Sequence, residues 1–147
     1  MFQKGSLGLE EAVRCAETVL GAAGTAGDRL AVAITDENGE LVYLARADLA
    51  GAQGLRQAIR RAYTAAFIGR DTQRFAEQLA EDGRTLADWA DPQLTTLPGG
   101  VTIRAGVQVV GAVGVSGAGE DRDEQLAALG AAAVDAQTGG RGGQAPP

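Results

Sequence analysis

Residues 98–117 have the sequence PGGVTIRAGVQVVGAVGVSG, and this stretch decides the fold. Its second half repeats small apolar residues with a two-residue period, at Val107, Val109, Gly111, Val113 and Val115. Such alternation predicts a strand with one face on a core, joined to a preceding strand by a turn near Ala105-Gly106. Gly111 and Gly114 weaken a strand, so we expect each to mark a bulge or a close approach of another backbone segment.

The central hairpin leads directly into a helix. Ser116-Gly117 ends the strand, and Asp121 with Glu124 three residues later forms the capping-box pattern that opens a helix. We expect this helix to run from about residue 121 to residue 136. A glycine-rich strand end beside a helix N-terminus offers free N–H groups to a ligand. We therefore expect the functional site at this strand end, although these residues do not identify the ligand.

Another hairpin is predicted upstream. Residues 30–36 and 41–47 have the character of strands, and Asn38-Gly39 between them is the strongest short-range signal for a tight turn. The two strands are therefore predicted to be antiparallel neighbours. We expect Asp36 to cap the turn.

Helices are predicted on both sides of this hairpin. Apolar residues spaced by three and four positions, followed by glycine stops, predict helices over residues 9–23, 55–66 and 72–82. Thr85 and Asp88 form a capping box for one further turn. Because the strands come in hairpins instead of alternating with helices, the order predicts an α+β fold. It would have one domain, with an antiparallel sheet and helices packed on it.

Composition argues against several classes of protein. The chain has 147 residues, 45% hydrophobic and 22% charged, which suits one globular domain. Its formal net charge of -6 argues against nucleic acid as a partner, because the phosphate backbone selects basic surfaces. We find no apolar run of about 18 residues and no apolar signal region at the start. No membrane span and a cytoplasmic location are therefore expected.

Cysteine and histidine usage limits the chemistry. Cys15 is the only cysteine, so an internal disulfide is impossible and a packed thiol is expected. The chain has no histidine, which removes the commonest general base, metal ligand and axial haem ligand. The acidic residues show no metal-ligand spacing, so we predict no metal site.

Six motifs, in order and at fitting spacings, resemble the GlcG/HbpS family. They are Val32–Val42, which is similar to that family's V-x-D-x-x-G-x-L-V hairpin, Arg46-Ala47-Asp48 (its Arg-x-Asp), Arg61–Ala65 (its Lys-Ala-x-Thr-Ala), Gly99–Ile103 (its Gly-Gly-x-Pro-Ile), Val110–Gly117 (its Gly-Ala-Ile-Gly-Val-Ser-Gly) and Asp123-Glu124 (its Asp-Glu). The resemblance covers roughly residues 6–137. We therefore expect a GlcG/HbpS-like domain at residues 1–138 and a flexible, Gly- and Pro-rich tail at residues 139–147.

The resemblance implies a profilin-like fold and homo-oligomers built from dimers. Members of the family have been connected with haem binding and degradation, and a related domain ends the PduO-type corrinoid adenosyltransferases. Two residues depart from the family pattern. Arg61 replaces the usual lysine, so Schiff-base or lysine-base chemistry does not carry over. Thr102 replaces a proline, a change expected to loosen the entry to the central hairpin.

We expect a pocket where three stretches of the chain converge, namely Gly99-Gly100, Ser116-Gly117 and Arg46–Asp48. The candidate ligand-binding residues are Arg46, Arg61, Gly99, Gly100, Ser116 and Gly117. The candidate catalytic residues are Asp48 and Asp123. Helix capping accounts for Asp121 and Glu124 but not for Asp123. Asp123 is therefore a candidate general base or oligomer contact.

Each of these residues also has a structural interpretation. Arg46 and Asp48 could form an ion pair or anchor a loop. Arg61 lies on an arginine-rich helix face, where it is either solvated or a clamp for a carboxylate or phosphate. Gly99-Gly100 either forms a turn with positive φ or lets the backbone approach a ligand. Ser116 has no histidine to activate it, so a turn or a hydrogen bond to ligand is favoured over a nucleophile.

Three functions stay open. The first is a small-ligand-binding protein, in the haem or tetrapyrrole range by resemblance. The second is an enzyme acting on a small carbonyl or carboxylate compound, as an isomerase, dehydratase or cyclase of a biosynthetic cluster. An arginine would hold the anion, and Asp48, Asp123 or a tyrosine would move the proton. The third is a structural assembly protein.

The cofactor is unknown. Any haem is expected to bind weakly and without histidine ligation. The side chains left for the iron are Tyr43, Tyr63, Cys15 and Met1, and a tyrosine is the least poor choice. The expected partners are a small molecule and further copies of the chain itself.

Overall fold

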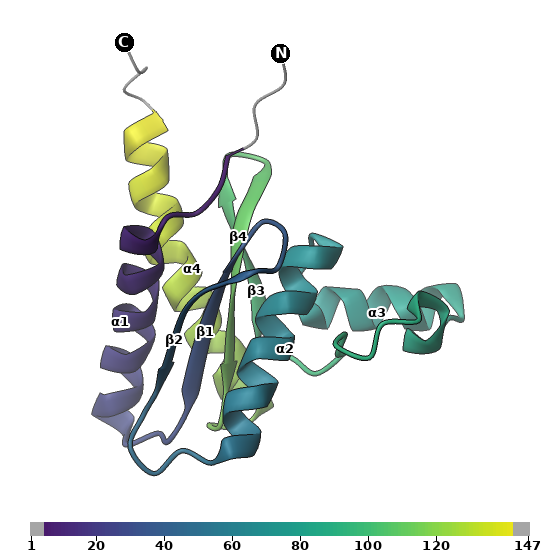
Figure 1. Ribbon diagram of the computed structural model, residues 1–147, viewed down its shortest axis with the longest axis horizontal. Coiled ribbons are helices and arrows are strands. Elements are labelled where there is room, and N and C mark those ends of the chain that lie inside the picture. The colour runs from purple at the N-terminus through teal and green to yellow at the C-terminus, as the bar shows by residue number, and fades with distance from the viewer. Residues whose placement is uncertain (1–4, 143–147) are drawn as a thin grey trace.

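The computed structural model of the chain describes residues 5–142, with side-chain surroundings for residues 5–134 (Figure 1). The elements, in chain order, are α1 (Leu9–Ala26), β1 (Ala31–Asp36), β2 (Leu41–Arg46), α2 (Ala52–Ile68), α3 (Thr72–Asp82), the short 3-10 helix η1 (Leu86–Trp89), β3 (Gly100–Ala105), β4 (Gln108–Ser116) and α4 (Glu120–Gly142). The strands form one antiparallel sheet with the order β2-β1-β4-β3. In Figure 1, α1 and α4 cover one face of the sheet, α2 covers the other, and α3 projects away beyond α2. This arrangement confirms the predicted α+β fold with one domain.

The first hairpin closes on the turn that the sequence predicts. β1 and β2 pair in antiparallel register. In the turn, Asp36 Oδ1 accepts hydrogen bonds from the N–H of Asn38 at 2.9 Å and from the N–H of Glu40 at 3.0 Å. Gly39 has a φ of 83°, which glycine adopts at little cost. The capping role of Asp36 is confirmed.

β3 and β4 form the predicted central hairpin, but the regular alternation expected along β4 is wrong in its first half. The pairing register shifts just after Ile103 in β3, so that Val110 is an extra residue in β4. This bulge reverses the alternation. Val110 turns into the core at 6% exposure, whereas Val107 in the turn is 93% exposed. The predicted period therefore holds from Gly111 onward, since an added Cβ at Gly111 would meet Leu7 of the core and Val113 and Val115 are buried in that core.

Thr102 ties down the entry to the central hairpin, which corrects the expectation that it loosens it. Its N–H donates to Asp71 Oδ1 at 2.9 Å, and its hydroxyl donates to the same oxygen at 3.2 Å. Asp71 immediately precedes α3, so these bonds join the outer edge of β3 to the start of that helix. A proline has no N–H and could not make the first of them.

The two faces of the sheet carry side chains of very different size. The face under α1 and α4 is an aliphatic core, whose larger buried members include Leu30, Val32, Ile34, Ile103, Val113, Val115, Leu126 and Val134. Cys15 lies in this core and is fully buried, as expected for a packed thiol. The face under α2 is built from small residues, with Ala31 and Ala33 of β1 against Ala58 and Ala62 of α2.

α2 lies directly on the backbone of the sheet. Gly100 and Gly114 pair across β3 and β4. A Cβ atom on Gly114 would overlap the carbonyl oxygen of Ala58 and lie 2.5 Å from the backbone nitrogen of Ala62. A Cβ atom on Gly100 would overlap the carbonyl oxygen of Arg61. The two glycines therefore form a patch without side chains on which α2 rests, which confirms the expected close approach at Gly114.

Two helix ends differ from the prediction. α1 continues through Gly24 and ends at Gly27, which has a φ of 76°. A helix tolerates an exposed glycine at modest cost. α4 runs to Gly142, into the stretch 139–147 that was predicted to be a tail. Residues 143–147 lie outside the described residues, and the tail there stays a prediction. In the described part of the chain, no helix is long and apolar enough to cross a membrane.

Replacing Gly114 by alanine should destabilise the protein by about 1–3 kcal/mol, because the added methyl group forces α2 away from the sheet. Urea unfolding measures the change. Gly21→Ala is the matched control, since Gly21 lies on the exposed side of α1 with no atom within 4 Å of an added Cβ. It should leave the stability unchanged or raise it by about 0.5–1 kcal/mol. Equal effects of the two substitutions would show that α2 does not rest on Gly114.

Candidate functional site

Most of the predicted site residues lie at one end of the sheet, where all four strands begin or finish. The carbonyl oxygen of Gly99 accepts a hydrogen bond from the N–H of Val115 at 2.9 Å, so the stretches Gly99-Gly100 and Ser116-Gly117 lie together as expected. Ala31 pairs with Ser116 on one side and with Arg46 on the other. Arg46 is therefore two strands away from Ser116, a separation of roughly 10 Å. The stretch Arg46–Asp48 therefore does not lie within the roughly 7 Å of the other two stretches that a single shared pocket requires. The predicted convergence of all three stretches is wrong.

Arg46 and Asp48 are both exposed. Among the described residues, neither side chain forms a hydrogen bond or an ion pair. The alternative interpretation, an ion pair between them, is therefore not formed either. Their proposed roles in ligand binding and catalysis stay predictions, and they do not contact the other candidate residues.

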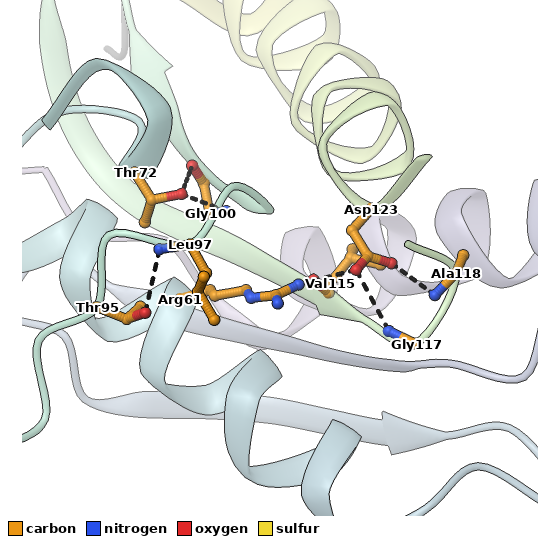
Figure 2. Close-up of polar contacts among 9 residues, drawn as sticks. All are labelled: Arg61, Thr72, Thr95, Leu97, Gly100, Val115, Gly117, Ala118 and Asp123. Carbon is orange, nitrogen blue, oxygen red and sulfur yellow. Dashed lines mark hydrogen bonds and ion pairs between the residues drawn. The ribbon is translucent and has the colours of Figure 1, made fainter. Parts of the chain in front are cut away.

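Arg61 and Asp123 form a buried ion pair at this end of the sheet (Figure 2). Arg61 Nη1 donates to Asp123 Oδ2 at 2.8 Å and to the carbonyl oxygen of Val115 at 2.7 Å. The two side chains are 6% and 3% exposed. Gly99 packs over the arginine, since a Cβ on Gly99 would lie 2.9 Å from Nη1. The solvated position considered for Arg61 is therefore wrong, because the glycine patch brings this part of α2 against the sheet.

Asp123 occupies the place where a bound anion was expected. Its Oδ1 accepts from the N–H of Ala118 at 2.8 Å, and its Oδ2 accepts from the N–H of Gly117 at 3.4 Å as well as from Arg61. The N–H groups of Gly117 and Ala118, just before α4, are thus used by a carboxylate of the chain itself. A general base needs an available lone pair, and three donors already compete for those of Asp123.

The remaining candidate residues are enclosed by neighbouring backbone. Ser116 is 6% exposed, and Gly54 at the start of α2 approaches its carbonyl oxygen. Gly99 and Gly117 have φ values of 126° and 130°, so the structural interpretation of Gly99 as a residue with positive φ is confirmed. An added Cβ at Gly117 would lie 2.5 Å from the carbonyl oxygen of Arg29.

A cleft that the sequence analysis did not anticipate lies on the other side of α2. It has a volume of about 370 Å³. Its walls are formed by α2, η1 and the loop that follows η1, through Arg60, Leu86, Ala87, Ala90, Asp91, Pro92 and Leu94. The only sequence signal for it was the placement of polar residues at Arg60, Tyr63 and Thr64, which share one side of a helix.

Three side chains of α2 hold the loop that forms the far wall of this cleft. The hydroxyl of Tyr63 donates to Asp91 Oδ2 at 2.6 Å. Arg60 Nη2 donates to the carbonyl oxygen of Pro92 at 2.7 Å. Thr64 Oγ1 accepts from the N–H of Thr95 at 3.0 Å. The hydrogen bond with Asp91 raises the pKa of Tyr63 to about 12, and the same bond lowers the pKa of the Asp91 carboxyl.

Arg61→Met should cost about 3–5 kcal/mol of stability, because it leaves Asp123 buried without its countercharge. Adding Asp123→Asn to that variant should restore part of the loss, since a neutral amide oxygen still accepts from Ala118. Urea unfolding of the single and double variants measures the coupling. Arg74→Met, which breaks an exposed ion pair with Glu77, is the control and should change the stability by about 1 kcal/mol at most. Strictly additive losses at Arg61 and Asp123 would contradict the pairing.

Alkaline titration of the two tyrosines, followed by near-ultraviolet absorbance, should show one ionising near pH 12. Because the folded pKa of Tyr63 is raised, its bond to Asp91 stabilises the fold below pH 10 and is lost as the pH rises toward 12. Asp91→Asn should move this transition back toward pH 10. Tyr43→Phe should leave it in place. Two tyrosines ionising together near pH 10 would contradict the bond.

Comparisons with known proteins agree with this architecture. A family model described as "Haem degrading protein HbpS-like" matches residues 7–132. Protein GlcG of Escherichia coli K12 is 37% identical over 87 residues, which are 59% of this chain and 63% of GlcG, so the match spans less than two thirds of that relative. The crystal structure of a double mutant of Streptomyces reticuli HbpS is 36% identical, with a TM-score of 0.82 and 90% of each chain covered.

A more distant structure shares the fold alone. The complex of PduOC with haem is 20% identical to this chain, with a TM-score of 0.78 over 87% of this chain and 94% of PduOC. The family match, in contrast, includes the whole sheet, α1, α2 and the first part of α4. The chain therefore belongs to the HbpS-like family.

Proposed function

We propose that this chain is a small-ligand-binding protein and that its ligand is haem or another tetrapyrrole. The observation that carries the proposal is the HbpS-like family match over residues 7–132. It is supported by the 36% identity with HbpS over nine tenths of both chains. The haem complex of PduOC adds only that this fold accommodates haem in another protein, because a shared fold does not establish a shared ligand.

The side chains of this protein do not suit direct ligation of haem iron. The sequence has no histidine. The Cys15 thiol is fully buried in the core. The hydroxyl of Tyr63 is bonded to Asp91, and its pKa of about 12 opposes formation of the phenolate that iron prefers. Tyr43 is half-buried on β2 and is the remaining phenol. Among the described residues, iron ligation is therefore limited to Tyr43, and we propose that the ligand is held mainly through its ring and its carboxylates.

Weak binding is expected from the charge of the chain. A formal net charge of -6 repels the two propionate groups of haem. Apolar contact must overcome this repulsion, so we expect a Kd on the order of micromolar or weaker.

No specific contact favours the enzyme that the sequence analysis kept as its alternative. Asp123 is held by Arg61 and by two backbone N–H groups, and Asp48 lies on an exposed turn without a partner among the described residues. A binding role needs neither carboxylate to move a proton. We therefore propose binding as the function of this chain.

Haemin and metal-free protoporphyrin IX should bind with Kd values within roughly threefold of each other, because iron ligation supplies little of the affinity. Titration followed by visible absorbance and by quenching of tryptophan emission measures both. Haemin that binds more than tenfold tighter, with a six-coordinate low-spin spectrum, would show that a side chain ligates the iron. Failure of both compounds to bind would overturn the proposed function.

A further inference from the structure

Arg60 has an unusual set of partners for a residue that lines a cleft. Its Nη2 donates to the carbonyl oxygens of Pro92 at 2.7 Å and Leu94 at 3.3 Å, which fixes the guanidinium against the loop. Its Nε is buried without a partner. Its Nη1 is neither buried nor hydrogen-bonded to any described residue. The one available nitrogen therefore belongs to a guanidinium that is already oriented, which reduces the cost of binding an anion.

Asp91 does not neutralise this arginine by direct contact. Asp91 Oδ2 accepts from the Tyr63 hydroxyl at 2.6 Å, and Asp91 Oδ1 accepts from the N–H of Gln93 at 2.9 Å. Both oxygens thus have other donors, and no ion pair joins Asp91 to Arg60 within the described chain. Arg60 therefore has no carboxylate within ion-pair distance in the described chain, although Asp91 lines the same cleft.

The rest of the cleft is suited to an apolar body. Its other lining residues are Leu86, Ala87, Ala90, Pro92 and Leu94. Ala90, with a φ of 52°, is the C-cap of η1 in the left-handed conformation, so it ends this short helix at the wall of the cleft. The volume of about 370 Å³ is near the lower end of the range for small-molecule sites. It therefore suits a small apolar carboxylate or the carboxylate-bearing edge of a larger flat ligand.

We infer that this cleft between α2 and residues 86–94 binds the carboxylate-bearing edge of the ligand, and that Arg60 Nη1 contacts the carboxylate. The inference rests on the proposed ligand-binding function and adds the place and the chemical class of the contact. It transfers the anion-binding role predicted for Arg61 to the neighbouring residue, because Arg61 is already paired with Asp123.

Porphyrin binding by Arg60 variants tests the inference. Trp89 is the only tryptophan and lies in η1, whose Leu86 and Ala87 line the cleft, but its own ring packs against Phe75 and lines a separate hollow. Quenching of its emission therefore reports binding near η1, and only the dependence on Arg60 assigns that binding to the cleft. Arg60→Met should weaken binding of protoporphyrin IX about ten- to hundredfold, the usual value of a hydrogen bond to a charged group. Arg60→Lys should restore part of that affinity. Arg56→Met, one helical turn away and exposed, removes the same charge and should have little effect.

The dimethyl ester of protoporphyrin IX separates a lost contact from a disturbed cleft. The ester has no propionate charge, so it should bind the unchanged protein and Arg60→Met equally well. Loss of ester binding in Arg60→Met would indicate collapse of the cleft and overturn the assigned contact. Equal binding of protoporphyrin IX to the unchanged protein and to Arg60→Met would also overturn it, while leaving the proposed function intact.

A second probe keeps the test decisive if no porphyrin binds at all. 1-Naphthoate carries one carboxylate on a small apolar ring system. If it quenches Trp89 in the unchanged protein and in Arg56→Met but not in Arg60→Met, the cleft assignment stands although the tetrapyrrole proposal fails. If naphthoate binds all three proteins equally, or none of them, the cleft assignment fails as well.

Discussion

The structure depends on the contact between the backbone of α2 and two glycines of the sheet. Gly100 and Gly114 face each other across β3 and β4, and no side chain separates them from the helix. A helix that approaches so closely can be matched only by small residues, which is why Ala58 and Ala62 meet alanines of β1. The larger aliphatic side chains are thereby confined to the opposite face, where α1 and α4 cover them. One close contact thus determines which face carries the main core.

The same contact decides the chemistry of the strand ends. It brings Arg61 against the sheet, where the long side chain passes under Gly99 to reach Asp123. The desolvation cost of two buried charges is offset better as more of their remaining donors and acceptors are satisfied. The backbones of Val115, Gly117 and Ala118 satisfy Arg61 Nη1 and both Asp123 oxygens, whereas Arg61 Nε is buried without a partner among the described residues. The pair therefore links α2, β4 and α4, and it uses the N–H groups of Gly117 and Ala118, which would otherwise be open to a ligand.

We propose that ligand recognition takes place on the outer side of α2. There the chain offers a guanidinium, apolar walls and a phenol that is engaged with a carboxylate. These groups bind and orient an anion more readily than they move protons, since an arginine stays charged at any useful pH. Tyr63 acts within this arrangement by holding the loop at Asp91, and its raised pKa is a consequence of that bond. Arg60 and Arg61 are adjacent in sequence, yet one is an internal countercharge and the other faces an open cleft.

The sequence by itself determined the local elements and the family resemblance. The turn at Asn38-Gly39 and the residues that cap it act over a few positions, and the helices follow from spacing and glycine stops, so short-range rules suffice. The bulge at Val110 was decided by pairing with β3, because strand alternation alone contains no register. The burial of Arg61 was decided by the sheet against which α2 packs. Helical periodicity predicts on which side of a helix an arginine lies, but it does not predict which element packs against that side. The cleft beside Arg60 joins residues about thirty positions apart, through Tyr63 with Asp91 and Thr64 with Thr95, and only tertiary structure brings such pairs together.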